Sequence, residues 1–173
     1  MTARIRNLSA DEAGRRVDEL SALLIDSVEG GASVGFLLPM TRAKADAFWA
    51  GVTTNVASGG RILLVAEAKD GRILGTAQLV FAAPENQPHR AVVSKLLVLL
   101  SARRQGLGAA MMRAVEAEAR AAGRTMLVLD TATAEAERVY ERAGWTRLGA
   151  LPDYALMPDA TLCDTVFYFK RLG

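Results

Sequence analysis

The sequence predicts an α/β fold, with one domain built on a mixed β-sheet that carries helices on both faces. Three observations support this prediction. Two strand-like runs are joined by an Asp-Gly pair, a glycine-rich loop opens a strongly amphipathic helix, and a short continuous apolar run follows that helix. The order strand, loop, helix, strand is typical of a βαβ unit, whose two strands lie parallel. No repeat or linker divides the chain, so we expect a single domain over residues 1–173.

The N-terminal half predicts one strand, two helices and a β-hairpin. Ser9 followed by Glu12 is the pattern of a capping box, and apolar residues at helical spacing then predict a helix that ends before Gly30. Asp70-Gly71 between two apolar runs indicates a hairpin, because glycine tolerates a positive φ. In chain order, these elements are expected over residues 4–8, 9–29, 41–57, 61–68 and 72–81.

The C-terminal half predicts the βαβ unit and a pair of closing strands. An apolar stripe that begins at Leu107 marks the amphipathic helix, with Glu116 off that stripe and Gly123 as the C-cap. The next strand ends at Asp130, and its continuous apolarity is typical of a strand covered on both faces. The strands are expected over residues 91–98, 125–130, 145–151 and 165–172, and the later helix over 134–143.

The composition excludes several classes of function. Hydrophobic residues make up 51% of the chain and charged residues 23%, with a formal net charge of +2. So small a positive excess gives no argument for a nucleic-acid or membrane partner. A single cysteine (Cys163) and a single histidine (His89) exclude an intrachain disulfide and every two-histidine zinc motif. The sequence shows no signal-peptide pattern and no membrane-length apolar run, so we expect a cytoplasmic protein without a bound metal.

The loop between strand 91–98 and the amphipathic helix has the chemistry of an anion site. Gly106 and Gly108 allow the backbone to approach a ligand closely. The unpaired N–H groups of the helix's first turn, together with the helix dipole, favour a negative charge there. Arg103 and Arg104 add positive charge. A diphosphate fits this arrangement.

The glycine spacing narrows the choice of diphosphate. The dinucleotide pattern G-x-G-x-x-G is not met, because Met111 stands where the third glycine should be. The chain also lacks the Gly-Lys-Ser/Thr of a Walker loop. The remaining pattern is the [RQ]-x-x-G-x-[GA] of acyl-CoA binding.

Two stretches, 95–108 and 136–145, resemble the GNAT family of N-acetyltransferases. The first is similar to the family's strand and pyrophosphate loop, and the second to its A-x-x-x-Y-x-x-x-G-[FW] block. Residues 30–36 and 151–159 look like the tabtoxin-resistance branch, whose members acetylate an amino group on a small toxin. The resemblance implies a mainly antiparallel sheet with a central parallel pair, and acetyl-CoA as co-substrate.

The resemblance also implies which residues bind acetyl-CoA and which act on it. It places Tyr140 next to the sulfur as proton donor; the alternative is that the Tyr140 ring only packs on the sheet and bonds locally. A backbone N–H near Leu97 and Val98 would serve the oxyanion. The implied cofactor-binding residues are Leu96, Leu97, Val98, Arg103, Arg104, Gln105, Gly106, Leu107, Gly108, Ala109, Thr133 and Tyr140.

Two positions depart from the family pattern. Thr133 stands where many relatives carry asparagine, and residues 92–94 offer no carboxylate where many relatives have a base. Asp130 is then the nearest acid for attracting or deprotonating an amine; the alternative is that it caps the turn 131–133. Lys95 is interpreted as a solvated charge at the edge of the sheet.

The expected acceptor is a primary amine of a small molecule. Ser33, Phe36, Asp130 and Tyr154 are the candidate substrate residues, although loop packing explains such residues equally well. The main alternative function is a non-catalytic acyl-CoA-binding regulatory module. The sequence does not identify the acceptor, and it leaves open whether the protein is a monomer or a homodimer.

Overall fold

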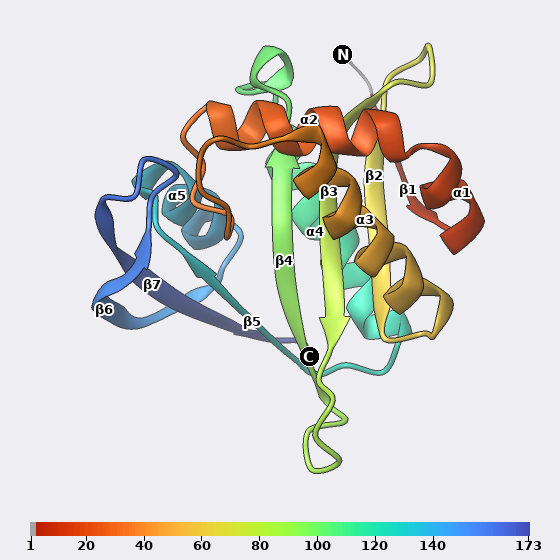
Figure 1. The fold of residues 1–173 in the computed structure, drawn as a ribbon. Coiled ribbons are helices and arrows are strands. Elements are labelled where there is room, and N and C mark those ends of the chain that lie inside the picture. The colour runs from red at the N-terminus through yellow and green to blue at the C-terminus, as the bar shows by residue number, and fades with distance from the viewer. Residues whose placement is uncertain (1–2) are drawn as a thin grey trace.

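A seven-stranded sheet forms the centre of the computed structural model, which describes residues 3–173 (Figure 1). The strand order is β1-β2-β3-β4-β5-β7-β6, and every neighbouring pair is antiparallel except β4 and β5. The predicted βαβ unit is therefore confirmed. The strands are β1 (Arg4–Leu8), β2 (Arg61–Glu67), β3 (Ile73–Phe81), β4 (Arg90–Val98), β5 (Met126–Thr131), β6 (Thr146–Leu156) and β7 (Leu162–Arg171).

Helices cover both faces of the sheet, as the sequence predicts (Figure 1). The helices are α1 (Ala10–Arg15), α2 (Val17–Glu29), α3 (Arg42–Ala57), α4 (Leu107–Ala121) and α5 (Ala134–Arg142). One apolar core lies between α1–α3 and the sheet, around Leu24, Trp49 and Leu63. A second core lies on the α4 side, around Met111 and Leu127. Within residues 3–173, no helix has the length and apolarity needed to cross a membrane.

The single helix predicted after Ser9 is wrong in one respect, because the chain divides it at Arg16 into α1 and α2. The capping box is confirmed: Glu12 N–H donates to Ser9 Oγ at 3.2 Å, and Ser9 N–H donates to the Glu12 carboxylate at 3.0 Å. The Arg16 guanidinium donates to Glu19 at 2.9 Å and to Glu67 on β2. The Arg16 guanidinium thus joins the start of α2 to β2 at the residue where the helix divides.

The two closing strands are longer than the sequence predicts. β6 continues to Leu156 and β7 begins at Leu162, so the polar turn shortens to 157–161. A register shift between Leu151 and Ala155 accommodates the proline and the positive-φ residue inside β6. An edge strand with a bulge tolerates proline, because no ladder hydrogen bond is needed there.

The separation of β4 from β5 positions the candidate site. The two strands pair only where Arg90–Val92 faces Met126–Val128, although β4 continues to Val98. Beyond that point the strands diverge (Figure 1), so the β5-facing edge of β4 lacks a strand partner over residues 93–98. Its backbone groups can therefore pair with a ligand instead.

A bulge shapes the same part of β4. The β3–β4 register shifts between Thr76 and Gln78, and Lys95 adopts a left-handed φ of 52°. Thr76 Oγ1 donates to the Lys95 carbonyl at 3.2 Å, which ties the bulge to β3. The extra residue changes the direction in which the Lys95 side chain leaves the strand.

Candidate active site

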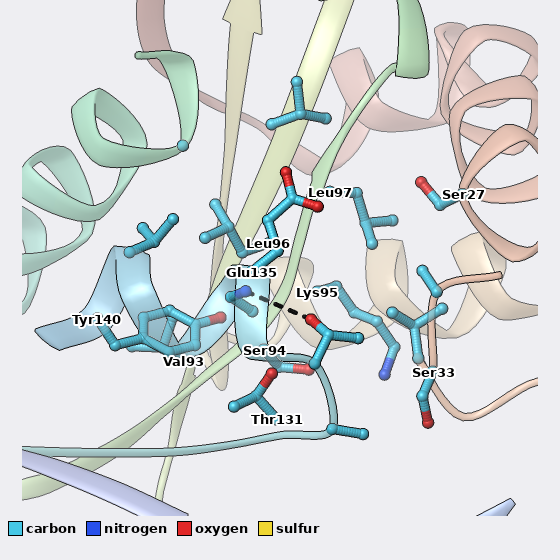
Figure 2. Close-up of a pocket in the computed structure, with 18 of the residues that line it drawn as sticks. Ser27, Ser33, Val93, Ser94, Lys95, Leu96, Leu97, Thr131, Glu135 and Tyr140 are labelled. Atoms are coloured by element: carbon cyan, nitrogen blue, oxygen red, sulfur yellow. Dashed lines mark hydrogen bonds between the residues drawn. The ribbon is translucent and has the colours of Figure 1, made fainter. Parts of the chain in front are cut away.

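A cleft of about 1210 Å³ opens where β4 and β5 diverge. Its walls are the loop 30–35, β4 from Val92, the loop 102–109, the end of β5 and the inner side of α5. Figure 2 shows side chains from β4, the end of β5 and α5 converging on this space. The cleft thus collects most of the predicted site residues, from segments far apart in the sequence.

The predicted anion loop forms one end of the cleft. Gly106 is the N-cap of α4 and has a φ of +76°, and no side chain caps this helix end. A Cβ added at Gly108 would meet no atom within 4 Å, so the space in front of the first turn is open. Arg103 donates from Nε to the Val98 carbonyl at 3.2 Å. The free N–H groups and the dipole of α4 suit a diphosphate here.

Most predicted cofactor residues line this cleft, and one does not. Gln105 is absent from the walls and is exposed to solvent. The residues at the cleft are Leu96, Leu97, Val98, Arg103, Arg104, Gly106, Leu107, Gly108, Ala109, Thr133 and Tyr140.

Tyr140 is buried, with its hydroxyl pointing into the cleft (Figure 2). Its ring lies between Trp145 and Tyr168, at centroid distances of 6.1 Å and 5.9 Å. The hydroxyl has no hydrogen-bond partner among residues 3–173, so the local bond that the packing alternative requires is not found. Burial, followed by the charge of Asp130, raises the pKa of Tyr140 to about 12. The phenol is therefore protonated at neutral pH and can donate.

Thr133, and not Asp130, caps the turn that follows β5. Asp130 lies at the end of β5, lines the cleft and is exposed. Within the described chain, its carboxylate accepts no bond from the turn that follows. Thr133 caps α5 instead, since its Oγ1 accepts from Ala136 N–H at 3.3 Å. The capping alternative for Asp130 thus has no support in the geometry.

Lys95 is not the solvated charge at the sheet edge that the sequence predicts. Its side chain is half-buried and lines the cleft, with Nζ 5.8 Å from the centroid of the Phe48 ring. Burial lowers the pKa of Lys95; Asp130 opposes this effect and Arg61 adds to it. The bulge causes the difference, because a regular alternation along β4 does not predict where this side chain points.

The candidate substrate residues are only partly brought together. Ser33 and Tyr154 line the cleft with Asp130. Phe36 does not, which corrects the prediction: its ring packs edge-on against Phe48 at 5.4 Å, on the margin of the α1–α3 core. Its ring is partly buried against Phe48 and the neighbouring core residues.

Glu116 lies off the apolar stripe of α4, and it is nevertheless buried. Lys170 Nζ donates to both Glu116 carboxylate oxygens at 2.8 Å, and Trp145 Nε1 donates to one of them at 3.2 Å. Lys170 also donates to the Ala143 carbonyl at 2.6 Å. This cluster joins α4, the end of α5 and β7, and so supports the helix that carries Tyr140.

Comparison with known proteins now identifies the family. The family model described as "Acetyltransferase (GNAT) family" matches residues 39–145, which is more than half of the chain. The protein belongs to the GNAT family of acetyltransferases. A relative from Azospirillum brasilense, described as an uncharacterized N-acetyltransferase in the hisH-hisA intergenic region, is 39% identical over 107 residues. The match spans 61% of this chain and only 61% of that relative.

Solved structures share the fold at low sequence identity. A ribosomal-protein-alanine N-acetyltransferase from Brucella melitensis superposes with a TM-score of 0.80 at 22% identity, over 98% of this chain and 99% of that one. A phosphinothricin acetyltransferase from Sinorhizobium meliloti, in complex with acetyl-CoA, has a TM-score of 0.82 at 19% identity, over 100% of this chain and 90% of that one. A putative acetyltransferase from Salmonella typhimurium, with acetyl-CoA, has a TM-score of 0.77 at 16% identity, over 100% of this chain and 95% of that one. The expected GNAT-like mixed sheet is confirmed.

The buried Glu116 cluster yields a prediction about stability. Lys170→Met removes the ammonium and leaves the Glu116 carboxylate buried, so the free energy of unfolding should fall by about 3 kcal/mol. Replacing both members, with Glu116→Leu added, should recover a large part of this loss. Chemical denaturation measures both, and exposed Arg171→Met is the matched control. Equal stability of the Lys170 and Arg171 variants would contradict the assignment.

Proposed function

We propose that this chain transfers an acetyl group from acetyl-CoA to a primary amine of a small molecule. The observation that carries the proposal is the Tyr140 hydroxyl, which points into a cleft bounded by the unpaired edge of β4 and by the Gly106 loop. Family membership supports the same reaction class. A fold alone does not establish a reaction, so the proposal depends on these groups.

The residues present fit acetyl-CoA. The N–H groups at Gly106–Ala109 would hold the diphosphate, with Arg104 close by. The free backbone of 93–98 would pair with the amide groups of the pantetheine arm, in the manner of an added strand. Acetyl-CoA supplies the activated acetyl thioester. Two structural neighbours hold it, which supports the same use of the cleft here.

The chain's own groups then meet the chemical needs of the transfer. Asp130 attracts the ammonium form of the acceptor and receives or relays its proton, because an alkyl ammonium has a pKa of about 10. Backbone N–H groups near Leu97 and Val98 donate to the thioester oxygen, where negative charge develops. Tyr140 donates its proton to the departing sulfur.

The second part of the proposal is the acceptor amine. An amino-acid-like toxin is one candidate, supported by the likeness of residues 30–36 and 151–159 to the tabtoxin-resistance branch. The alternative function, an acyl-CoA-binding module without turnover, follows from the missing carboxylate at 92–94. Release of CoA in the presence of an amine panel distinguishes a catalyst from such a module.

The Gly106 loop can be tested by binding alone. Gly108→Glu places a carboxylate in the open space before α4, where it should repel the diphosphate, so CoA affinity should fall at least 100-fold. Isothermal titration calorimetry measures the affinity. Gly51→Glu is the matched control, since Gly51 is also helical with open space at its Cβ but lies outside the cleft. If the Gly108 variant binds CoA with unchanged affinity, the proposal that this loop holds the diphosphate is wrong.

Tyr140→Phe should lower kcat by roughly 100-fold with little change in CoA affinity. The substitution keeps the ring, which packs against Trp145 and Tyr168, and removes only the hydroxyl. Tyr168→Phe is the control, because that hydroxyl bonds Glu137 and Glu141 outside the reaction path. A Tyr140 variant within twofold of the parent would leave the residue a packing role only.

Asp130→Asn should lower kcat/KM by roughly tenfold, or about 1.4 kcal/mol of transition-state stabilisation. Asparagine keeps the shape and loses the charge that attracts the amine. Steady-state kinetics measure the effect, and Asp153→Asn is a control because Asp153 is exposed and lies outside the cleft walls. Parental kinetics with a lower melting temperature would instead give Asp130 a structural role.

A further inference from the structure

Lys95 presents an ammonium group to the side of the cleft that faces the loop 30–35. Figure 2 shows its Nζ pointing toward Ser33, away from Tyr140. A Cβ added at Gly35 would lie 3.7 Å from this nitrogen, so the group is close to the loop backbone. The position is set by the bulge, because the Lys95 φ of 52° turns the side chain out of the regular alternation of β4.

This ammonium has no carboxylate partner. Among residues 3–173, no Asp or Glu oxygen lies within 4.0 Å of Lys95 Nζ. Its Nζ lies over the face of the Phe48 ring, 5.8 Å from the centroid. Lys170 offers the contrast, since its shielded ammonium has both oxygens of Glu116. An anion bound beside this half-buried ammonium would offset the cost of its partial burial.

A second cation increases the positive potential around Lys95. Arg61 on β2 is partly buried, and its guanidinium donates to Gln78 and, at 3.2 Å, to Asn55 rather than to a carboxylate. Burial lowers the pKa of Lys95, the Asp130 charge raises it, and the Arg61 charge lowers it by a smaller amount. Two charges of opposite sign therefore act on Lys95, and the Asp130 carboxylate has the larger effect of the two.

We propose that Lys95 binds an anionic group of the acceptor, so that the substrate is an amine that also carries a carboxylate. This inference rests on the proposed acetyl transfer. The amine lies beside Asp130 and Tyr140, while the carboxylate accepts from Lys95 Nζ. An acceptor with a second positive charge at that place is repelled. Lys95 is then a specificity-determining residue for amino-acid-like acceptors.

Kinetics with paired acceptors test the proposal. CoA release is measured for a panel of L-amino acids, each beside the amine that lacks its carboxylate. The parent protein should prefer the carboxylated member of the pair. In Lys95→Met this preference, as a ratio of kcat/KM values, should fall at least tenfold through KM. Lys95→Arg should keep most of it, and exposed Lys69→Met should keep all of it.

Two kinetic outcomes would overturn the proposal. The first is a parent protein that prefers the amines without a carboxylate. The second is a Lys95→Met variant that loses kcat equally for both members of every pair, because that pattern would make Lys95 a proton acceptor for the amine. Methionine keeps an apolar side chain over the Phe48 ring. The melting temperature of the Lys95→Met variant shows whether it is folded.

A binding measurement separates failure of this inference from failure of the proposed function. Calorimetry on CoA-loaded protein compares N-acetyl-amino acids with the N-acetyl-amines that lack the carboxylate, so no turnover is needed. Absence of CoA release with every acceptor would reject the proposed transfer. The Lys95 site still stands if an N-acetyl-amino acid binds the parent and binds Lys95→Met at least tenfold more weakly. Equal affinity of the two proteins, or no binding to the parent, would reject the site.

Discussion

The structure depends on one constraint, the early end of the pairing between β4 and β5. Three residues, Arg90–Val92, keep the two strands together, and afterwards each follows a different neighbour. β4 remains on β3, while β5 continues on β7 to the pair of Thr131 with Val166. Had the pairing continued, the backbone of 93–98 would be satisfied within the sheet and the cleft would be closed. The Gly106 loop, Tyr140 and Lys95 face the same space only because the strands diverge.

Features that depend on neighbours in sequence could be predicted from the sequence. Ser9 and Glu12 cap each other three residues apart, and the Asp70-Gly71 turn joins adjacent strands. The open N-terminus of α4 at Gly106 belongs to this class, because it comes from the loop's own glycine and from the helix that starts there. Local chemistry accounts for these features without distant contacts, and they were enough to predict the fold class.

Features that depend on distant partners could not be predicted in this way. Glu116 has the helical phase of a solvent-facing residue, and only Lys170, 54 positions later, makes its burial tolerable. Phe36 belongs to a loop that the sequence predicts to contact a ligand, but its ring packs edge-on against Phe48. Lys95 depends on a register shift in β3 that no pattern in β4 indicates. In each case the local pattern is misleading, because a contact or register shift that involves a distant part of the chain determines where the side chain lies.

Asp130 links the two ends of the cleft through its charge. It raises the pKa of Tyr140 beyond the effect of burial, and it opposes the loss of basicity that burial imposes on Lys95. An ammonium beside Asp130 offsets this charge, so the Tyr140 phenolate is less disfavoured and the phenol becomes a stronger acid when an amine is bound. The same offset makes the charge on Lys95 harder to maintain, and a carboxylate beside Lys95 restores it. An acceptor that carries both charges would therefore make the Tyr140 phenol a stronger acid and also keep Lys95 charged. A simple amine would make the phenol a stronger acid but would not keep Lys95 charged.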